Sequence, residues 1–215
     1  LILSFILSVL LLATGSDLSF VFAKNNTLPT YDEFVADLRA SGAPAGVYAE
    51  NLFAFPIRQQ PANNASFVSS EPDVVTEFAL ANQYQTIGLL AHNTLAGAWF
   101  SQLQAGQTIS VVYTDGTSKI FEVAEIQRYQ ALSPTNPRSD FVSLDEPGKR
   151  LSASELFHHV YAPGQRLVLQ TCIEANGNPS WGRLFVIAYP KSVPPLQVLT
   201  TYPLDWMFGV SFRAQ

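Results

Sequence analysis

Cys172 is the single cysteine of the 215-residue chain, and it ends an apolar run at residues 167–172 (LVLQTC). His92 ends a second apolar run, and Arg183 opens a third one eleven residues after the cysteine. A thiolate can attack a carbonyl carbon, but a free cysteine is mostly protonated at neutral pH. A neighbouring histidine can take that proton and later protonate a leaving amine, while an arginine can stabilise the oxyanion formed in between. These residue types therefore predict acyl transfer on a cysteine.

The three side chains must be brought together by the strands that carry them. If residues 167–172 pair as a hairpin with the strand that Arg183 opens, Cys172 and Arg183 emerge at the same end of the sheet. Each residue taken alone also has a structural interpretation: a buried core thiol, a histidine at a strand end, and a solvated arginine. Their joint occurrence in matching local contexts favours the catalytic interpretation.

Short strands separated by turns dominate the rest of the pattern. Asp115-Gly116 is typical of a hairpin turn. Serine or threonine followed three positions later by glutamate, as at Thr30 and Ser152, predicts the start of a helix. We expect a mainly β fold, a small closed barrel of about eight strands with a few short helices. The expected strands cover 47–57, 85–91, 108–113, 119–129, 166–173 and 183–189, the expected helices 30–41, 72–81 and 152–160, and an irregular stretch 133–150.

Composition excludes several classes of function. The chain is 47% hydrophobic and only 13% charged, and its net charge of -5 comes without the basic stripe that nucleic-acid binding requires. It has neither the glycine-rich dinucleotide motif nor the phosphate-binding loop of nucleotide enzymes. One cysteine allows no internal disulfide and no cysteine cluster for zinc. We therefore expect no metal and no cofactor.

Residues 1–23 form an apolar segment that ends in Val-Phe-Ala before Lys24. This pattern indicates a secretory signal peptide or an N-terminal membrane anchor, with a buried helix as the third interpretation. We expect a linker with a short helix at 24–46, the catalytic barrel at 47–190 and a C-terminal tail at 191–215. The domain is then extracytoplasmic, either secreted or anchored to the outer face of the cytoplasmic membrane.

Two segments carry a family resemblance. Residues 169–172 (LQTC), with Arg183 downstream, resemble the Leu-x-Thr-Cys and downstream arginine signature of the sortases. Residues 91–94 (AHNT), followed by 99–103 (WFSQL) and a glycine, resemble that family's histidine segment, in which a helical turn and a glycine-led strand follow. The resemblance covers roughly residues 84–190. Residues 47–75 match the family's opening strands only loosely, and many members have glycine before the histidine.

The resemblance implies an eight-stranded barrel and a cysteine transpeptidase. Such an enzyme cuts a Leu-Pro-x-Thr-Gly-type sorting signal between threonine and glycine, then joins the acyl group to an amine on a wall precursor or a pilin. It implies that Cys172 is the nucleophile, His92 the general acid/base and Arg183 the oxyanion or substrate clamp. It further implies that Thr171 and Asn93 contact the substrate.

Other interpretations remain open at this point. The same triad would serve a cysteine peptidase or amidase that only hydrolyses, and the barrel could bind peptide or wall without catalysis. His158 and His159 are rivals for the histidine role, although neighbouring helical positions point apart. The acidic residues of the irregular stretch could line a cation site beside the substrate groove, but acids in a loop are usually solvated; they are Asp140, Asp145 and Glu146.

Overall fold

The computed structural model describes residues 28–191, in which ten strands form one sheet. Their order is β10-β9-β4-β3-β2-β1-β5-β6-β7-β8, and β6 also pairs with β10. That extra pairing closes eight of the strands into a barrel and leaves β7 and β8 outside it. The strands are β1 Ala45–Ala49, β2 Phe53–Gln59, β3 Val75–Glu77, β4 Ile87–Leu90, β5 Thr108–Tyr113, β6 Ser118–Ala131, β7 Phe141–Ser143, β8 Arg150–Leu151, β9 Leu167–Ala175 and β10 Asn178–Pro190.

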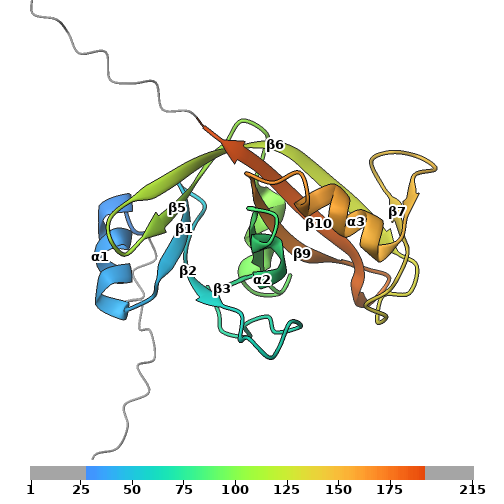
Figure 1. The fold of residues 1–215 in the computed structure, drawn as a ribbon, viewed down its shortest axis with the longest axis horizontal. Helices are drawn as coiled ribbons and strands as arrows, with labels where there is room; N and C mark the ends of the chain where they lie inside the picture. The colour runs from blue at the N-terminus through green and yellow to red at the C-terminus, as the bar shows by residue number, and fades with distance from the viewer. Residues whose placement is uncertain (1–27, 192–215) are drawn as a thin grey trace, which may run out of the picture.

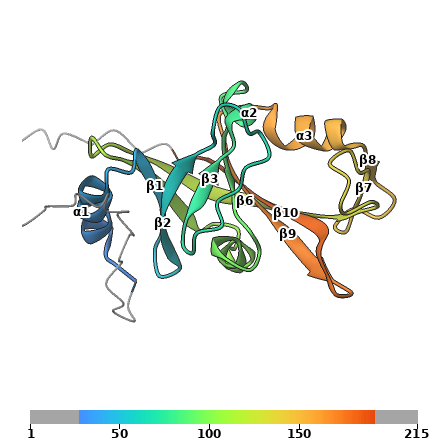
Figure 2. The same ribbon diagram turned by 90° about the horizontal axis from the view of Figure 1, so that it is seen from below.

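The predicted closed barrel of about eight strands is confirmed. Figures 1 and 2 show β6 and β10 running along one another through the middle of the molecule, where their pairing closes the ring. Closure leaves the ring without a free strand edge, which is the usual way in which a small β domain hides its unpaired backbone groups.

Two helices cover the barrel from outside. α1 (Tyr31–Ser41) and α3 (Ala153–Tyr161) begin with the predicted capping boxes, in which the side chain of the residue before the helix and a glutamate satisfy each other's backbone N–H groups. Figures 1 and 2 place these helices at opposite sides of the molecule. Two shorter elements, α2 (Ala79–Asn82) and the 3-10 helix η1 (Ala96–Gln102), flank β4 in the chain.

Side chains alternate between the barrel interior and the face beneath α3. In β9, Leu167 and Leu169 belong to the interior core, whereas Val168 packs outside with Leu156 and Val160 of α3. Each fully buried leucine or valine contributes roughly 1.5–3 kcal/mol of transfer free energy. The alternation therefore fixes which residues of a strand can reach the outer surface.

Two expectations about the first half of the chain are wrong. Residues 72–81 do not form one helix, because β3 lies there as a buried strand, with Ile57 of β2 opposite Val75 in a parallel pair. Residues 47–57 do not form one strand: β1 and β2 make a hairpin, and Pro56 lies inside β2. The irregular stretch 133–150 also contributes the short strands β7 and β8.

None of the helices within residues 28–191 is long and apolar enough to cross a membrane. The predicted signal or anchor segment at 1–23 lies outside the described residues. So does the predicted C-terminal tail, apart from Lys191.

Candidate active site

Cys172 and Arg183 face each other across the β9–β10 hairpin. The register pairs Cys172 directly with Arg183, as the expected hairpin requires. Directly opposed residues of an antiparallel pair project to the same face, with Cβ atoms about 5 Å apart. The two side chains therefore share one patch of surface.

That patch lies on the outer face of the barrel, toward the α3 side. Leu169 points into the interior, and Gln170 points outward, where its Oε1 accepts a 2.6 Å hydrogen bond from the hydroxyl of Tyr161 in α3. Because strand side chains alternate, Cys172 shares the outward direction of Gln170. Its side chain is half-buried, so the thiol is sheltered but within reach of a ligand.

His92 follows the neighbouring strand β4, which ends at Leu90. β4 runs parallel to β9 in a register that pairs Leu90 with Gln170, and the Ala91 N–H donates to the Gln170 carbonyl at 3.2 Å. The paired part of β4 ends at Leu90, two residues before His92, and the hydrogen bond from Ala91 is the last one between these segments that precedes the histidine. The histidine is exposed, and its carbonyl accepts hydrogen bonds of 3.0 Å from Leu95 N and Gly97 N, which turn the chain into η1.

Thr171 ties the two strands together from the interior side. Its side chain is only 4% exposed, and its hydroxyl donates a 2.9 Å hydrogen bond to the Ala91 carbonyl. Gly97 lies so close that a Cβ there would contact the Thr171 hydroxyl oxygen and lie 2.7 Å from the His92 carbonyl oxygen. The hydroxyl that the motif predicts to contact substrate is thus engaged inside the protein, directly beneath the histidine segment.

Asn93 provides a second tie on the outside. Its Nδ2 donates a 3.1 Å hydrogen bond to the carbonyl of Pro179 near the start of β10. The segment that carries His92 is thereby attached to the hairpin that carries Cys172 and Arg183.

Sequence reasoning did not single out Gly97, because a lone glycine after a histidine is too common to indicate a contact.

The guanidinium of Arg183 is held by the hairpin itself. Its Nη1 donates to the carbonyls of Ser180 and Gly182 at 3.0 and 2.8 Å. Within residues 28–191 its Nε and Nη2 have no acceptor, and Arg183 forms no salt bridge there. The group is oriented, and it keeps donors available for an oxygen presented at the surface.

The rival histidines make contacts of their own. His158 stands edge-on to the ring of Tyr84, with centroids 5.8 Å apart. Burial lowers the pKa of His159, and the positive charge of Lys149 lowers this pKa further. Tyr84, which His158 contacts, lies outside the β9–β10 hairpin that carries Cys172.

The three acids of the stretch 133–150 are each paired with a base. Asp140 pairs with Arg150 at 2.6 Å, Asp145 with Arg128 at 2.8 Å, and Glu146 with Lys149 at 2.7 Å. Among residues 28–191, no three acidic, histidine or cysteine side chains gather in a way that could hold a metal ion. The structure therefore does not assemble these acids into the cation site that the sequence left open.

No protein-family model matches the chain, and no curated protein matches it either. Solved structures that it resembles include sortase A from Corynebacterium diphtheriae, at 14% identity over 81% of this chain and 74% of the other, with a TM-score of 0.48. Sortase C-1 from Actinomyces oris matches at 15% identity over 78% and 83%, with a TM-score of 0.47. Sortase E1 from Streptomyces coelicolor, solved with a tripeptide in its active site, matches at 16% identity over 70% and 88%, with a TM-score of 0.44.

These neighbours are sortases, the family that the two sequence segments resemble. With TM-scores below 0.5, the likeness carries no argument about activity.

Proposed function

We propose that this chain is a sortase-like cysteine transpeptidase. The observation that supports this most directly is the pairing of Cys172 with Arg183 across β9 and β10. β4, which pairs with β9, leads to His92 two residues beyond its end. A thiol, a base and an oriented cation on one surface patch match the needs of acyl transfer through a thioester.

In the first half of the proposed reaction, His92 takes the thiol proton and the Cys172 sulfur attacks a peptide carbonyl carbon. The carbonyl oxygen becomes an oxyanion that accepts hydrogen bonds from the available donors of Arg183. The carbon–nitrogen bond then breaks, and His92 gives its proton to the departing amine. The product is a thioacyl-enzyme and a free amine, with every proton accounted for.

The second half runs the same steps in reverse with a new amine. An incoming amine attacks the thioester carbon and loses a proton to His92. The carbon–sulfur bond then breaks, and His92 gives its proton to the departing sulfur of Cys172. Water in place of the amine would give hydrolysis. Only the acceptor distinguishes a transpeptidase from a peptidase or amidase with the same groups.

Thr171 and Asn93 act in this proposal as positioning residues. The hydroxyl of Thr171 is buried against Ala91, and the amide of Asn93 is bonded to Pro179. Both bonds run between the histidine segment and the strands that carry the other two groups. They would hold the base at a fixed height relative to the thiol, which acyl transfer requires to within a fraction of an ångström.

The proposed substrate is a secreted surface protein with a Leu-Pro-x-Thr-Gly-type signal, and the proposed acceptor is an amine on a wall precursor or pilin. Such partners place the enzyme outside the cytoplasm, secreted or tethered to the membrane through its N-terminal segment. Fractionation of native cells checks this, because recovery of uncleaved protein in the soluble cytosol would contradict it.

Mass spectrometry of a reaction with a sorting-signal peptide tests the proposed activity. We expect cleavage between threonine and glycine, a covalent adduct on Cys172, and transfer to triglycine when that amine is added. Cleavage with no transfer product at any triglycine concentration would identify a hydrolase. Peptide binding without an adduct, equal in wild type and Cys172→Ala, would identify a non-catalytic barrel.

A further inference from the structure

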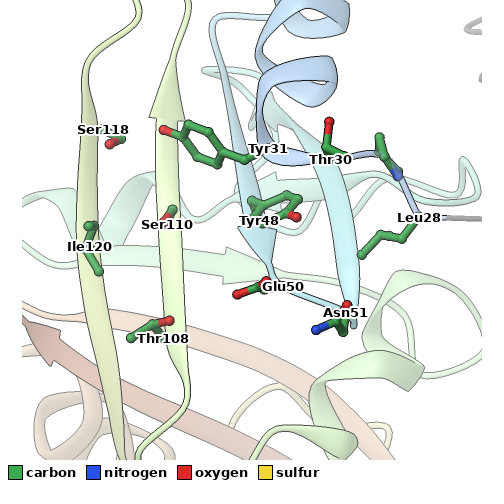
Figure 3. Close-up of a pocket in the computed structure, with 11 residues that line it drawn as sticks. Leu28, Thr30, Tyr31, Tyr48, Glu50, Asn51, Thr108, Ser110, Ser118 and Ile120 are labelled. Carbon is green, nitrogen blue, oxygen red and sulfur yellow. The ribbon is translucent and has the colours of Figure 1, made fainter.

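A cavity of about 640 Å³ lies on the outer face of the barrel, between the start of α1 and strands β1, β5 and β6. Figure 3 shows Tyr31 and Tyr48 beside these strands, with Glu50 and Asn51 at the other end. We propose that this cavity binds a neutral oligosaccharide. The proposal is independent of the function proposed for Cys172.

The cavity has its own place in the fold, remote from the hairpin. Ile120 lines it at one end of β6, whereas Tyr129, nine residues further on, pairs with Arg183. At ~3.3 Å per residue, the strand separates the two positions by about 30 Å. A ligand in this cavity therefore does not occupy the patch that holds Cys172.

The arrangement of α1 explains why the cavity is open. α1 packs its buried Phe34 and Leu38 over Val112, near the end of β5. Farther along the same face, Ser110 and Ile120 lie opposite each other and are only partly buried. The helix thus covers one part of the outer face and leaves the adjoining part as the floor of the cavity.

The lining is rich in hydroxyl groups that are free to bond a ligand. Within residues 28–191 five lining hydroxyls have no hydrogen-bond partner in the protein; they belong to Tyr31, Tyr48, Thr108, Ser110 and Ser118. A carboxylate and an amide, of Glu50 and Asn51, complete the polar set. Such groups can both donate to and accept from a ligand that carries many hydroxyls.

The charge of the lining selects against anions. Among the described residues the lining contains no lysine, arginine or histidine, and Glu50 is its one carboxylate. A phosphate or carboxylate would meet that negative charge without a compensating cation. A sugar diol, by contrast, can donate two hydrogen bonds to one carboxylate, which makes a neutral polyol the better match.

The two tyrosine rings supply the aromatic part of the site. Tyr31 meets Tyr48 edge-on, with ring centroids 5.5 Å apart at 86°, so each ring fixes the other. A rigid aromatic ring with a polar tip offers large contact area at small entropy cost. β-1,4-linked hexopyranoses present flat C–H faces that can pack on such a ring, while their hydroxyls point to the edges.

The shape favours a chain of sugars over a single ring. A second cavity of about 230 Å³ adjoins the first and shares Glu50, Asn51 and Thr108 with it. The two cavities meet at the β1–β2 turn, which carries Glu50 and Asn51. An extended ligand can therefore pack against the tyrosines at one end and reach Gln107 at the other.

Isothermal titration of the full-length chain with cellotriose and with N-acetylchitotriose tests the proposal. We expect saturable binding of at least one of them and weakening by about tenfold in Tyr31→Ala, which removes one aromatic contact. Glu50→Gln keeps the shape and should weaken binding severalfold. Tyr84→Ala, which alters a half-buried tyrosine outside this cavity, is the matched control and should bind like wild type.

Several results would overturn the proposal. The first is the absence of saturable binding for both trisaccharides. The second is a loss of trisaccharide affinity in Tyr84→Ala as large as in Tyr31→Ala. The third is binding of the neutral peptide Gly-Ser-Gly as tight as that of the trisaccharides. If Tyr31→Ala unfolds, as a thermal melt would show, Glu50→Gln decides, and wild-type affinity in that variant counts against the site. Acyl transfer on Cys172 is assayed in parallel, and Glu50→Gln should leave it unchanged.

Discussion

Replacing Thr171 by valine tests whether its hydroxyl holds the active site together or contacts the substrate. The hydroxyl donates its 2.9 Å hydrogen bond to the Ala91 carbonyl in a region where both residues are buried. Valine keeps the branched shape and leaves that carbonyl without its donor. An unsatisfied buried acceptor costs ~1–3 kcal/mol, so we expect a loss of about 2 kcal/mol in the free energy of unfolding.

The loss should be visible in two assays. A destabilisation of about 2 kcal/mol lowers the melting temperature of a domain of this size by ~4–8 °C. The Ala91 carbonyl precedes His92 directly, so its release should let the base drift, and a displacement near 1 Å costs on the order of 10²-fold in rate. In acyl-transfer kinetics we expect kcat to fall while KM stays close to wild type.

Thr171→Ser is the matched control. It keeps the hydroxyl and removes one buried methyl group, which costs ~0.5–1.5 kcal/mol but leaves the hydrogen bond in place. The turnover number should therefore stay close to wild type in Thr171→Ser and fall in Thr171→Val. A raised KM with unchanged stability in Thr171→Val would show that the hydroxyl contacts the substrate and would refute the positioning role.

Substitutions at three further positions, two of them with a control elsewhere, address the proposed chemistry. Cys172→Ala should abolish adduct formation and transfer while changing the melting temperature by only a few degrees; turnover in this variant would refute the mechanism. His92→Ala should lose ~10²–10⁴-fold in kcat and His158→Ala almost nothing, and the opposite order would reassign the base. Arg183→Lys should fall almost as far as Arg183→Ala, ~10²–10³-fold, because lysine lacks the planar fork, whereas Arg128→Lys should retain full turnover. Near-normal turnover of Arg183→Lys would rule out the directional hydrogen-bonding role of Arg183 and leave a role for its positive charge alone.

Local patterns predicted those parts of the fold that local contacts determine. The capping boxes at Thr30 and Ser152, the alternation in β5 and the Asp115-Gly116 turn are all decided within a few residues. The β9–β10 hairpin is also decided by contacts between residues close in the sequence. Its register could therefore be anticipated closely enough to place Cys172 beside Arg183.

Long-range pairing accounts for what the sequence did not predict. Residues 72–81 carry an apolar spacing compatible with a helix, but Val75 is completely buried in a strand that pairs with β2. Nothing near Val75 in the sequence indicates that partner. The bond between Thr171 and Ala91 likewise spans 80 positions and depends on where η1 lies, so the motif alone suggested a different role for the hydroxyl.

The separation in sequence between the strands of the barrel has a consequence for the order of folding. The hairpin that pairs Cys172 with Arg183 needs only a short loop, whereas β4, which precedes His92, pairs in parallel with β9 across about eighty residues. Contacts of such long range form slowly, because the entropy of closing the intervening loop must be overcome first. The thiol and its arginine can therefore meet before the base arrives. In terms of the proposed mechanism, the folding chain would lack its base until β4 has docked against β9.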